Sequence, residues 1–322
     1  MIKDFIIQMG EKHRGNQIVE AIENNNASKL HYLLGKNKTF DIENPVNCFN
    51  KVMVITRSAD LGLIYLDNIK RKFQPDQKAL NTSVNLPHAD ELIKKVISEM
   101  SVGKSSEEIN IRLSMALRHC YDPVYLYFLV EKGADIHYKQ ERKETKKTKA
   151  PISINSLMNA ITSSGEEEVS YTESLIIHLS EEFVSRDIKD RFDKITKNQN
   201  FYQGYDYIQS MMKVAFELGA NPNDFYTDPY SKKNVGIFEI IANGYNKPIG
   251  KSLIQIHKQQ YKDIFYILAQ NNVPMIDVIK DPVLNQKLKE VYCEIEKGKI
   301  MENINKSDEL SSGSGVVRKK RL

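Results

Sequence analysis

The sequence predicts a mainly α-helical chain in which short helix–turn–helix pairs stack side by side as a solenoid. Apolar residues recur in i, i+3, i+4 trios, the spacing of one helical face. The short breaks between trios carry Asn, Gly or Pro, which end or start helices. Glycine and proline, 15 and 10 of 322 residues, are too sparse for an all-β protein full of tight turns.

The first helix pair is expected within residues 16–34. A run of three asparagines, Asn24 to Asn26, separates two apolar trios. The trios are Ile18, Ala21 and Ile22, followed by Leu30, Leu33 and Leu34. Because asparagine tolerates the left-handed backbone that ends a helix, we expect two short helices joined by a tight turn.

The same unit recurs along the chain. In residues 111–132, Pro123 suits the first turn of a second helix and Gly133 suits its end. Residues 208–218 and 261–270 have the pattern of further second helices, each followed by glycine or asparagine. One short pair cannot bury its apolar face alone, whereas stacked pairs can, so the recurrence favours a solenoid.

The ends of these units resemble ankyrin repeats. Leu-Val-Glu-Lys-Gly-Ala-Asp-Ile-His, residues 129–137, resembles the repeat ending in which a helix runs into Gly-Ala-Asp-x-Asn. Phe-Glu-Leu-Gly-Ala-Asn-Pro-Asn, residues 216–223, resembles it again. Residues 16–37 and 253–272 keep the spacing of the repeat without a gap.

The chain also departs from the ankyrin pattern. No copy has the Thr-Pro-Leu-His start, and insertions separate the copies. The resemblance implies an all-α, ankyrin-like helical solenoid with roughly five to seven degenerate repeats. It also implies that the inner helices and the projecting fingers bind a partner protein. A generic α–α solenoid is the structural alternative.

Three regions are expected: an N-terminal segment 1–15, the repeat array 16–302 and a disordered basic tail 303–322. Inside the array, polar residues 74–87 are expected to form a connection. Residues 139–151 are basic and are expected to form a solvated loop. The alternative for this loop is a contact with an acidic partner or a membrane surface.

The C-terminal region resembles the translocation tails of type IV secretion effectors from intracellular bacteria. Acidic residues precede the small polar residues 311–315, and they are Glu290, Glu294, Glu296 and Glu302. The N-terminus lacks the apolar run of a signal peptide, and no stretch approaches the roughly 20 apolar residues of a membrane span. We therefore expect a soluble, cytoplasmic protein, whose secretion into a host cell would need no signal peptide.

No residue pattern points to catalysis, a cofactor or a metal. Cys48, Cys120 and Cys293 are scattered, and the seven histidines form no HExxH or other ligand spacing. The loop between Gly244 and Gly250 resembles a phosphate-binding loop but has five residues between its glycines, where the motif needs four. We expect no catalytic, cofactor-binding or metal-binding residues, and no small-molecule substrate.

Two other functions compete with protein binding. One is an enzyme with a cryptic helical catalytic domain near residues 150–210, where the repeat match is weakest. The other is a nucleic-acid-binding helical repeat, which the net charge of only +4 makes the weaker hypothesis.

The expected partner-binding residues lie on two fingers, just after the glycines that end second helices. An exposed aromatic side chain among charges is typical of an interface anchor. The alternative is that Phe225 and Tyr226 pack between neighbouring fingers. The expected residues are His137, Tyr138 and Lys139 on one finger, and Asp224, Phe225, Tyr226 and Tyr230 on the other.

Overall fold

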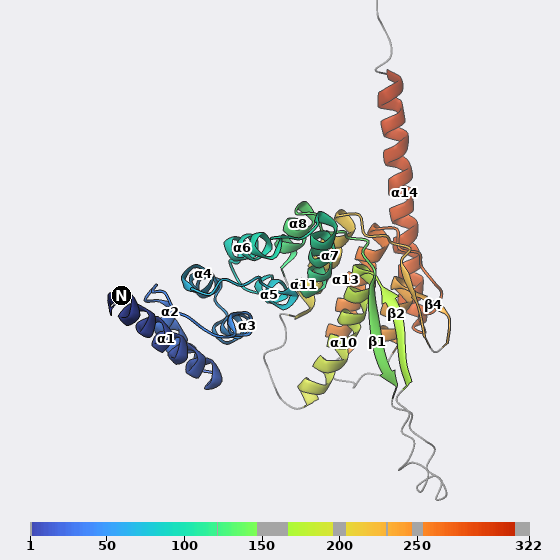
Figure 1. Cartoon of the computed structure of the whole chain (residues 1–322). Helices are drawn as coiled ribbons and strands as arrows, with labels where there is room; N and C mark the ends of the chain where they lie inside the picture. The colour runs from blue at the N-terminus through green and yellow to red at the C-terminus, as the bar shows by residue number, and fades with distance from the viewer. Residues whose placement is uncertain are drawn as a thin grey trace, which may run out of the picture. The chain divides into compact units, whose positions relative to one another are not determined.

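The computed structural model is mostly helical and divides into two compact units, Met1–Tyr138 and Lys139–Leu322 (Figure 1). This confirms the prediction of a mainly α-helical chain. Four short strands in the described part of the chain were not predicted. The structure describes residues 2–120, 122–146, 167–195, 204–229, 231–246 and 254–312.

Helices of the first unit pack as consecutive pairs. The first helix of each of the first three pairs contacts the first helix of the next pair, and the apolar side chains between helices form the core. The helices are α1 (Ile2–Glu23), α2 (Ala27–Leu34), α3 (Pro45–Thr56), α4 (Ala59–Asn68), α5 (Gln77–Ser83), α6 (Asp90–Met100), α7 (Ser106–Ala116), the 3₁₀ turn η1 (Leu117–His119) and α8 (Pro123–Glu131).

The turns between these helices agree with the sequence. Asn25 adopts φ 48° between α1 and α2, and the Asn26 side chain accepts a hydrogen bond from the Lys29 amide at the start of α2. Pro123 opens α8, and Gly133 follows α8 with φ 106°. The predicted break and both helix ends are therefore confirmed, because each depends on the conformation that one residue type adopts readily.

Two expectations for the first unit are wrong. Residues 1–15 are not a separate segment, because α1 is continuous from Ile2 through the first predicted helix. Residues 74–87 are not only a connection, because they contain α5. The Asp76 carboxylate caps α5 by accepting from the Ala79 amide, and Ala79 and Leu80 are fully buried. A seven-residue helix is too short to show two turns of apolar periodicity.

The second unit combines helices with two strand pairs. Strand β2 contacts β3, α10 contacts α11 and α12, and α13 contacts α11, α12 and α14. Its elements are β1 (Gln140–Lys146), β2 (Glu167–Glu173), α10 (Leu175–Ile195), α11 (Gly204–Glu217), β3 (Phe225–Thr227), β4 (Asn234–Gly236), α12 (Ile237–Tyr245), α13 (Ile254–Gln270) and α14 (Pro282–Ser312). The pairs β1–β2 and β3–β4 are antiparallel.

The residues that end helices in the second unit are again as expected. Gly219 follows α11 with φ 96°, and Asn272 follows α13 with φ 60°. Two expectations are wrong. Residues 140–146 of the basic segment 139–151 do not form a loop, because they form strand β1 and pair with β2. The tail 303–322 is helical through Ser312, where α14 ends, and residues 313–322 lie outside the described residues.

Candidate functional site

The first expected finger follows α8 in the first unit. Asp135 holds the backbone in a turn, since its carboxylate accepts a hydrogen bond from the His137 amide at 2.9 Å. The His137 side chain is exposed and Tyr138 is half-buried. Both residues follow Gly133, whose backbone is left-handed.

The second expected finger contains a small cluster around Phe225 in the second unit. Lys139 Nζ lies 3.6 Å from Asp224 Oδ1 and 5.8 Å from the centroid of the Phe225 ring. Asp224 is buried, whereas Phe225 is 45% exposed. We call Lys139, Asp224 and Phe225 the finger cluster. All three residues belong to the second unit, although the sequence placed Lys139 on the first expected finger.

Tyr226 lies on the opposite face of strand β3 from Phe225, because side chains alternate along a strand. Its ring centroid is 5.1 Å from that of Tyr171 on β2, and its side chain is half-buried. The two aromatic residues of this finger therefore have different surroundings: Phe225 faces solvent and Tyr226 packs between strand pairs. Tyr230, also expected to bind, lies outside the described residues.

A hollow of about 410 Å³ opens beside these strands. Its lining is about half polar and half apolar, and the polar groups can accept hydrogen bonds from a partner or donate them to it. Its walls are Glu141, Ser170, Tyr171, Thr172, Thr227, Pro229 and Lys232.

A second hollow, of about 570 Å³, lies in the first unit between α1, α3 and residues 41–44. Its lining includes Lys12 and Lys51, and both are exposed. Residues of α1 and α3 and of the segment 41–44 together form this hollow.

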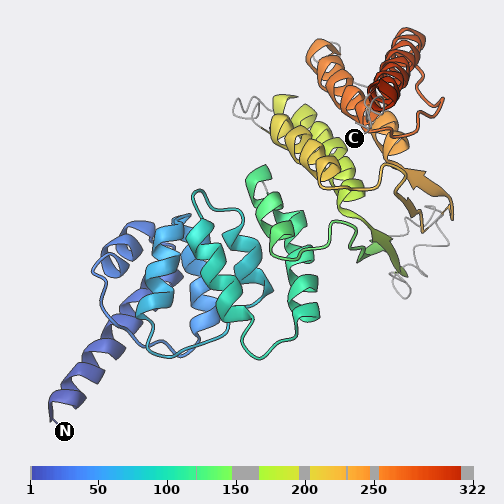
Figure 2. The same cartoon turned by 90° about the horizontal axis from the view of Figure 1, so that it is seen from above.

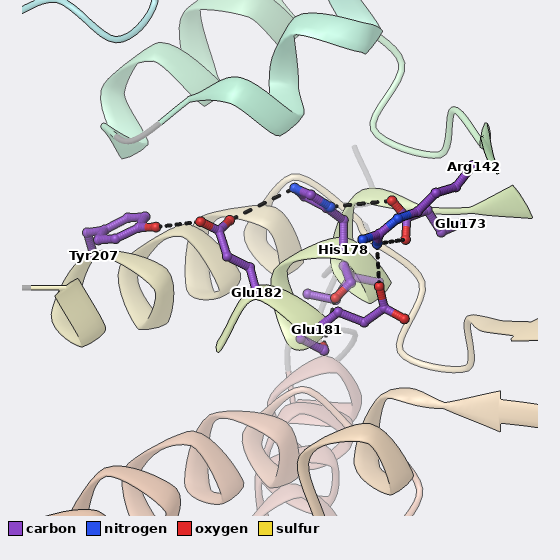
Figure 3. A network of polar contacts seen from close by, with 8 residues as sticks. Arg142, Glu173, His178, Glu181, Glu182 and Tyr207 are labelled. Atoms are coloured by element: carbon purple, nitrogen blue, oxygen red, sulfur yellow. Dashed lines mark hydrogen bonds and ion pairs between the residues drawn. The ribbon is translucent and has the colours of Figure 1, made fainter. Parts of the chain in front are cut away.

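A network of charged side chains ties β1, β2, α10 and α11 together (Figure 3). Arg142 Nη1 lies 3.3 Å from Glu173 Oε2 and 2.6 Å from Glu181 Oε2. His178 Nδ1 lies 3.3 Å from Glu173 Oε1, and its Nε2 lies 3.9 Å from Glu182 Oε2. The Tyr207 hydroxyl donates to Glu182 Oε1 at 2.9 Å. We call these six residues the ion network.

Glu173 is the most enclosed member of the ion network. It is only 2% exposed, directly precedes Ser174 and the start of α10, and lies between the Arg142 guanidinium and the His178 imidazole. A buried carboxylate is costly to desolvate, so these two partners have a large effect on the stability of this part of the unit. The other members are more exposed to solvent.

Sequence reasoning missed the ion network. Among its described contacts, the one at helical spacing joins His178 and Glu182, four residues apart on α10. Arg142 is 31 residues before Glu173 and reaches it only because β1 pairs with β2. The network does lie within or near residues 150–210, the region in which a cryptic catalytic centre was considered.

In the described ranges, no group of three His, Cys, Asp or Glu side chains is arranged to hold a metal ion. None of the helices described there is long and apolar enough to span a bilayer. Comparison with known proteins found no matching family model, no matching curated protein and no matching solved structure.

Proposed function

We propose that the chain is a non-enzymatic protein–protein interaction module built as a degenerate ankyrin-like array of helix pairs. Left-handed residues follow three of the second helices: Asn37 after α2, Gly133 after α8 and Gly219 after α11. At these positions an ankyrin repeat turns from its second helix into a finger. In such arrays the helices bury the apolar faces and the fingers remain available for a partner.

The finger cluster carries this proposal. Phe225 exposes almost half of its surface, although the helices and Tyr226 already supply apolar contacts for the core. Lys139 lies over the Phe225 ring and beside the Asp224 carboxylate, which limits the conformations of both side chains. An ordered, exposed aromatic ring surrounded by charges has the features of an interface anchor.

The test compares two exposed aromatic residues. Proteins captured from a cell lysate by the full chain would be compared with those captured by Phe225→Ala and by Tyr32→Ala, a control on α2 whose side chain is also exposed. We expect Phe225→Ala to lose captured proteins that the control retains. Equal capture by all three chains would remove the finger cluster from the binding surface.

The ion network favours a second candidate, an enzyme. A histidine between two carboxylates is an arrangement used for acid–base chemistry. Stability separates the two functions, because catalytic residues are commonly destabilising whereas structural networks stabilise. His178→Asn should lower the stability of the second unit if the network is structural. An unchanged or raised stability would favour the catalytic function.

A further inference from the structure

Polar side chains from two helices line the hollow of about 570 Å³ in the first unit. Helix α1 packs against α3 there, and both helices belong to the blue part of Figure 2. The lining residues of α1 recur every three or four positions from Gln8 to Glu23, so they lie along one face of the helix. The lining residues of α3 run from Asn47 to Lys51. We call this site the α1–α3 hollow.

The charges that line the α1–α3 hollow balance. Arg71 Nε lies 3.5 Å from Asp41 Oδ1, so these two charges offset each other. Among the residues that the structure describes, the other four charged groups form no ion pair. A nucleic acid or an anionic membrane needs an excess of cations, which this lining does not have. The cations are Lys12, Lys51 and Arg71, and the anions are Glu23, Asp41 and Glu43.

Carboxamide side chains are the most distinctive part of the lining. Gln8 and Asn16 come from α1 and Asn47 comes from α3, and all three are exposed. Within the described ranges these three side chains form no hydrogen bond with the rest of the chain. A carboxamide can accept from a peptide N–H and donate to a peptide carbonyl oxygen at the same time. Each edge of an extended peptide offers both groups at every second residue.

The volume of the α1–α3 hollow fits a short extended segment. An extended chain rises about 3.3 Å per residue, and its packed cross-section is about 4.8 Å by 10 Å. Each residue therefore takes roughly 160 Å³, so the hollow holds about three or four residues. The same volume holds little more than about one turn of α-helix, which is too short to be stable by itself. The volume thus favours an extended ligand over a helical one.

We propose that the α1–α3 hollow binds a segment of about three or four residues of a partner protein in an extended conformation, mainly through the backbone of that segment. Asn16 and Asn47 hydrogen-bond its amides from two different helices, and the half-buried Val19 contacts one apolar side chain. Recognition of the backbone makes binding depend little on the charge of the segment. This inference rests on the proposed function, because it names the form in which a partner protein is bound.

The test selects peptides from a phage-displayed library of random heptapeptides. The full chain is the bait, and the double variant Asn16→Ala with Asn47→Ala is the comparison. We expect peptides that are enriched on the wild type and not on the double variant. In fluorescence polarisation, a synthetic copy of an enriched peptide should bind Asn16→Ala about fivefold to thirtyfold more weakly, the effect of losing one or two hydrogen bonds. Methylation of its central backbone amides should weaken binding similarly, because it removes N–H donors.

Gln17→Ala is the matched control. Gln17 is the next carboxamide along α1, but it does not line the hollow, and its Nε2 lies 3.2 Å from His13 Nε2. Its substitution should change peptide binding by less than about twofold, the range of a residue outside the interface. Alanine favours the helix at both positions, so neither Asn16→Ala nor Gln17→Ala should lose helical signal in far-UV circular dichroism.

Several results would overturn the proposal. They are equal enrichment on the wild type and the double variant, equal losses for Asn16→Ala and Gln17→Ala, and full binding of the methylated peptide. Competition by oligothymidine would assign the hollow to single-stranded nucleic acid instead.

This site and the finger cluster can fail separately, because they lie in different units. Phe225→Ala should leave peptide binding unchanged. If Phe225→Ala lost captured proteins while no peptide was enriched, the α1–α3 hollow alone would be refuted. If a peptide was enriched while capture by Phe225→Ala equalled that of the wild type, the finger cluster alone would be refuted.

Discussion

Two glycines of α1 should respond in opposite ways to the same substitution. Gly10 is exposed and has no heavy atom within 4 Å of an added Cβ, apart from its own helix and chain neighbours. Gly15 is buried where the chain at Asp41 crosses the helix. A Cβ on Gly15 would overlap the Asp41 carbonyl oxygen, and it would lie 2.9 Å from the carbonyl carbon and 3.3 Å from Ile42 Cγ1.

The magnitudes follow from these surroundings. Gly10→Ala should stabilise α1 by about 0.5–1 kcal/mol, because alanine loses less backbone entropy than glycine in a helix. Gly15→Ala has the same advantage, but the overlap is with backbone, which cannot rotate away. Shifting residues 41–42 to relieve this overlap should lower the stability by about 1–3 kcal/mol, as overpacking usually does. The shift would also strain the hydrogen bond from the Asp41 amide to the Glu11 carbonyl.

Hydrogen exchange measured by mass spectrometry suits this comparison, because it follows the peptides of each of the two units separately. The chain has no tryptophan whose fluorescence could report unfolding. Peptides covering α1 to α4 should exchange more slowly in Gly10→Ala than in the wild type and faster in Gly15→Ala. Circular dichroism during urea unfolding gives an independent order of stability. If Gly15→Ala proved as stable as Gly10→Ala, the close approach of residue 41 to α1 would be wrong.

Three further predictions concern charged and aromatic residues. Hydrogen bonding from Lys70, and then from Thr39, holds the pKa of Glu11 below its ordinary value. The contribution of the ionised Glu11 to folding stability is therefore present at neutral pH and is lost as the pH falls through that lowered pKa. The difference in stability between wild type and Glu11→Gln should narrow below about pH 4 in acid titrations. Arg142→Gln leaves the buried Glu173 carboxylate with less compensation. It should lower the free energy of unfolding in urea by on the order of 1–3 kcal/mol, less than for a fully buried pair because Arg142 is partly exposed. Adding Glu173→Gln should recover part of this loss, and purely additive effects in the double variant would argue against coupling between the two residues. Tyr226→Ala should lower the melting temperature more than Phe225→Ala does, because only Tyr226 packs on Tyr171; the reverse order would mean that Phe225 belongs to the core.

The sequence predicted the helical pairs best where one residue controls a turn. The left-handed backbone at Asn25, Gly133 and Gly219 follows from residue type, and so does the start of α8 at Pro123. These features depend on contacts within a few residues, and a pattern in the sequence can therefore predict them. The finger residues were expected from the same turns, and their role in binding stays a prediction.

The strands were missed for a physical reason. Strand β1 contains only polar and charged residues, from Gln140 to Lys146, so it shows no alternation of apolar and polar residues. Its partner β2 starts 27 positions after β1 starts, and the pairing depends on that long-range contact. α5 was missed for a different reason, because one short capped helix resembles a polar connection.

The sequence by itself indicated the helices within residues 16–34, 111–132, 208–218 and 261–270 and the residues that end them, because apolar spacing and turn residues act locally. Only the tertiary structure decided which side chains are buried, which are exposed and which pair with one another. It separated Phe225, which faces solvent, from Tyr226, which packs on Tyr171. It joined Arg142 to Glu173 across two strands, and it left Phe5, Ile6 and Met9 of α1 exposed. Burial and pairing depend on residues that are distant in the chain, and no local pattern records them.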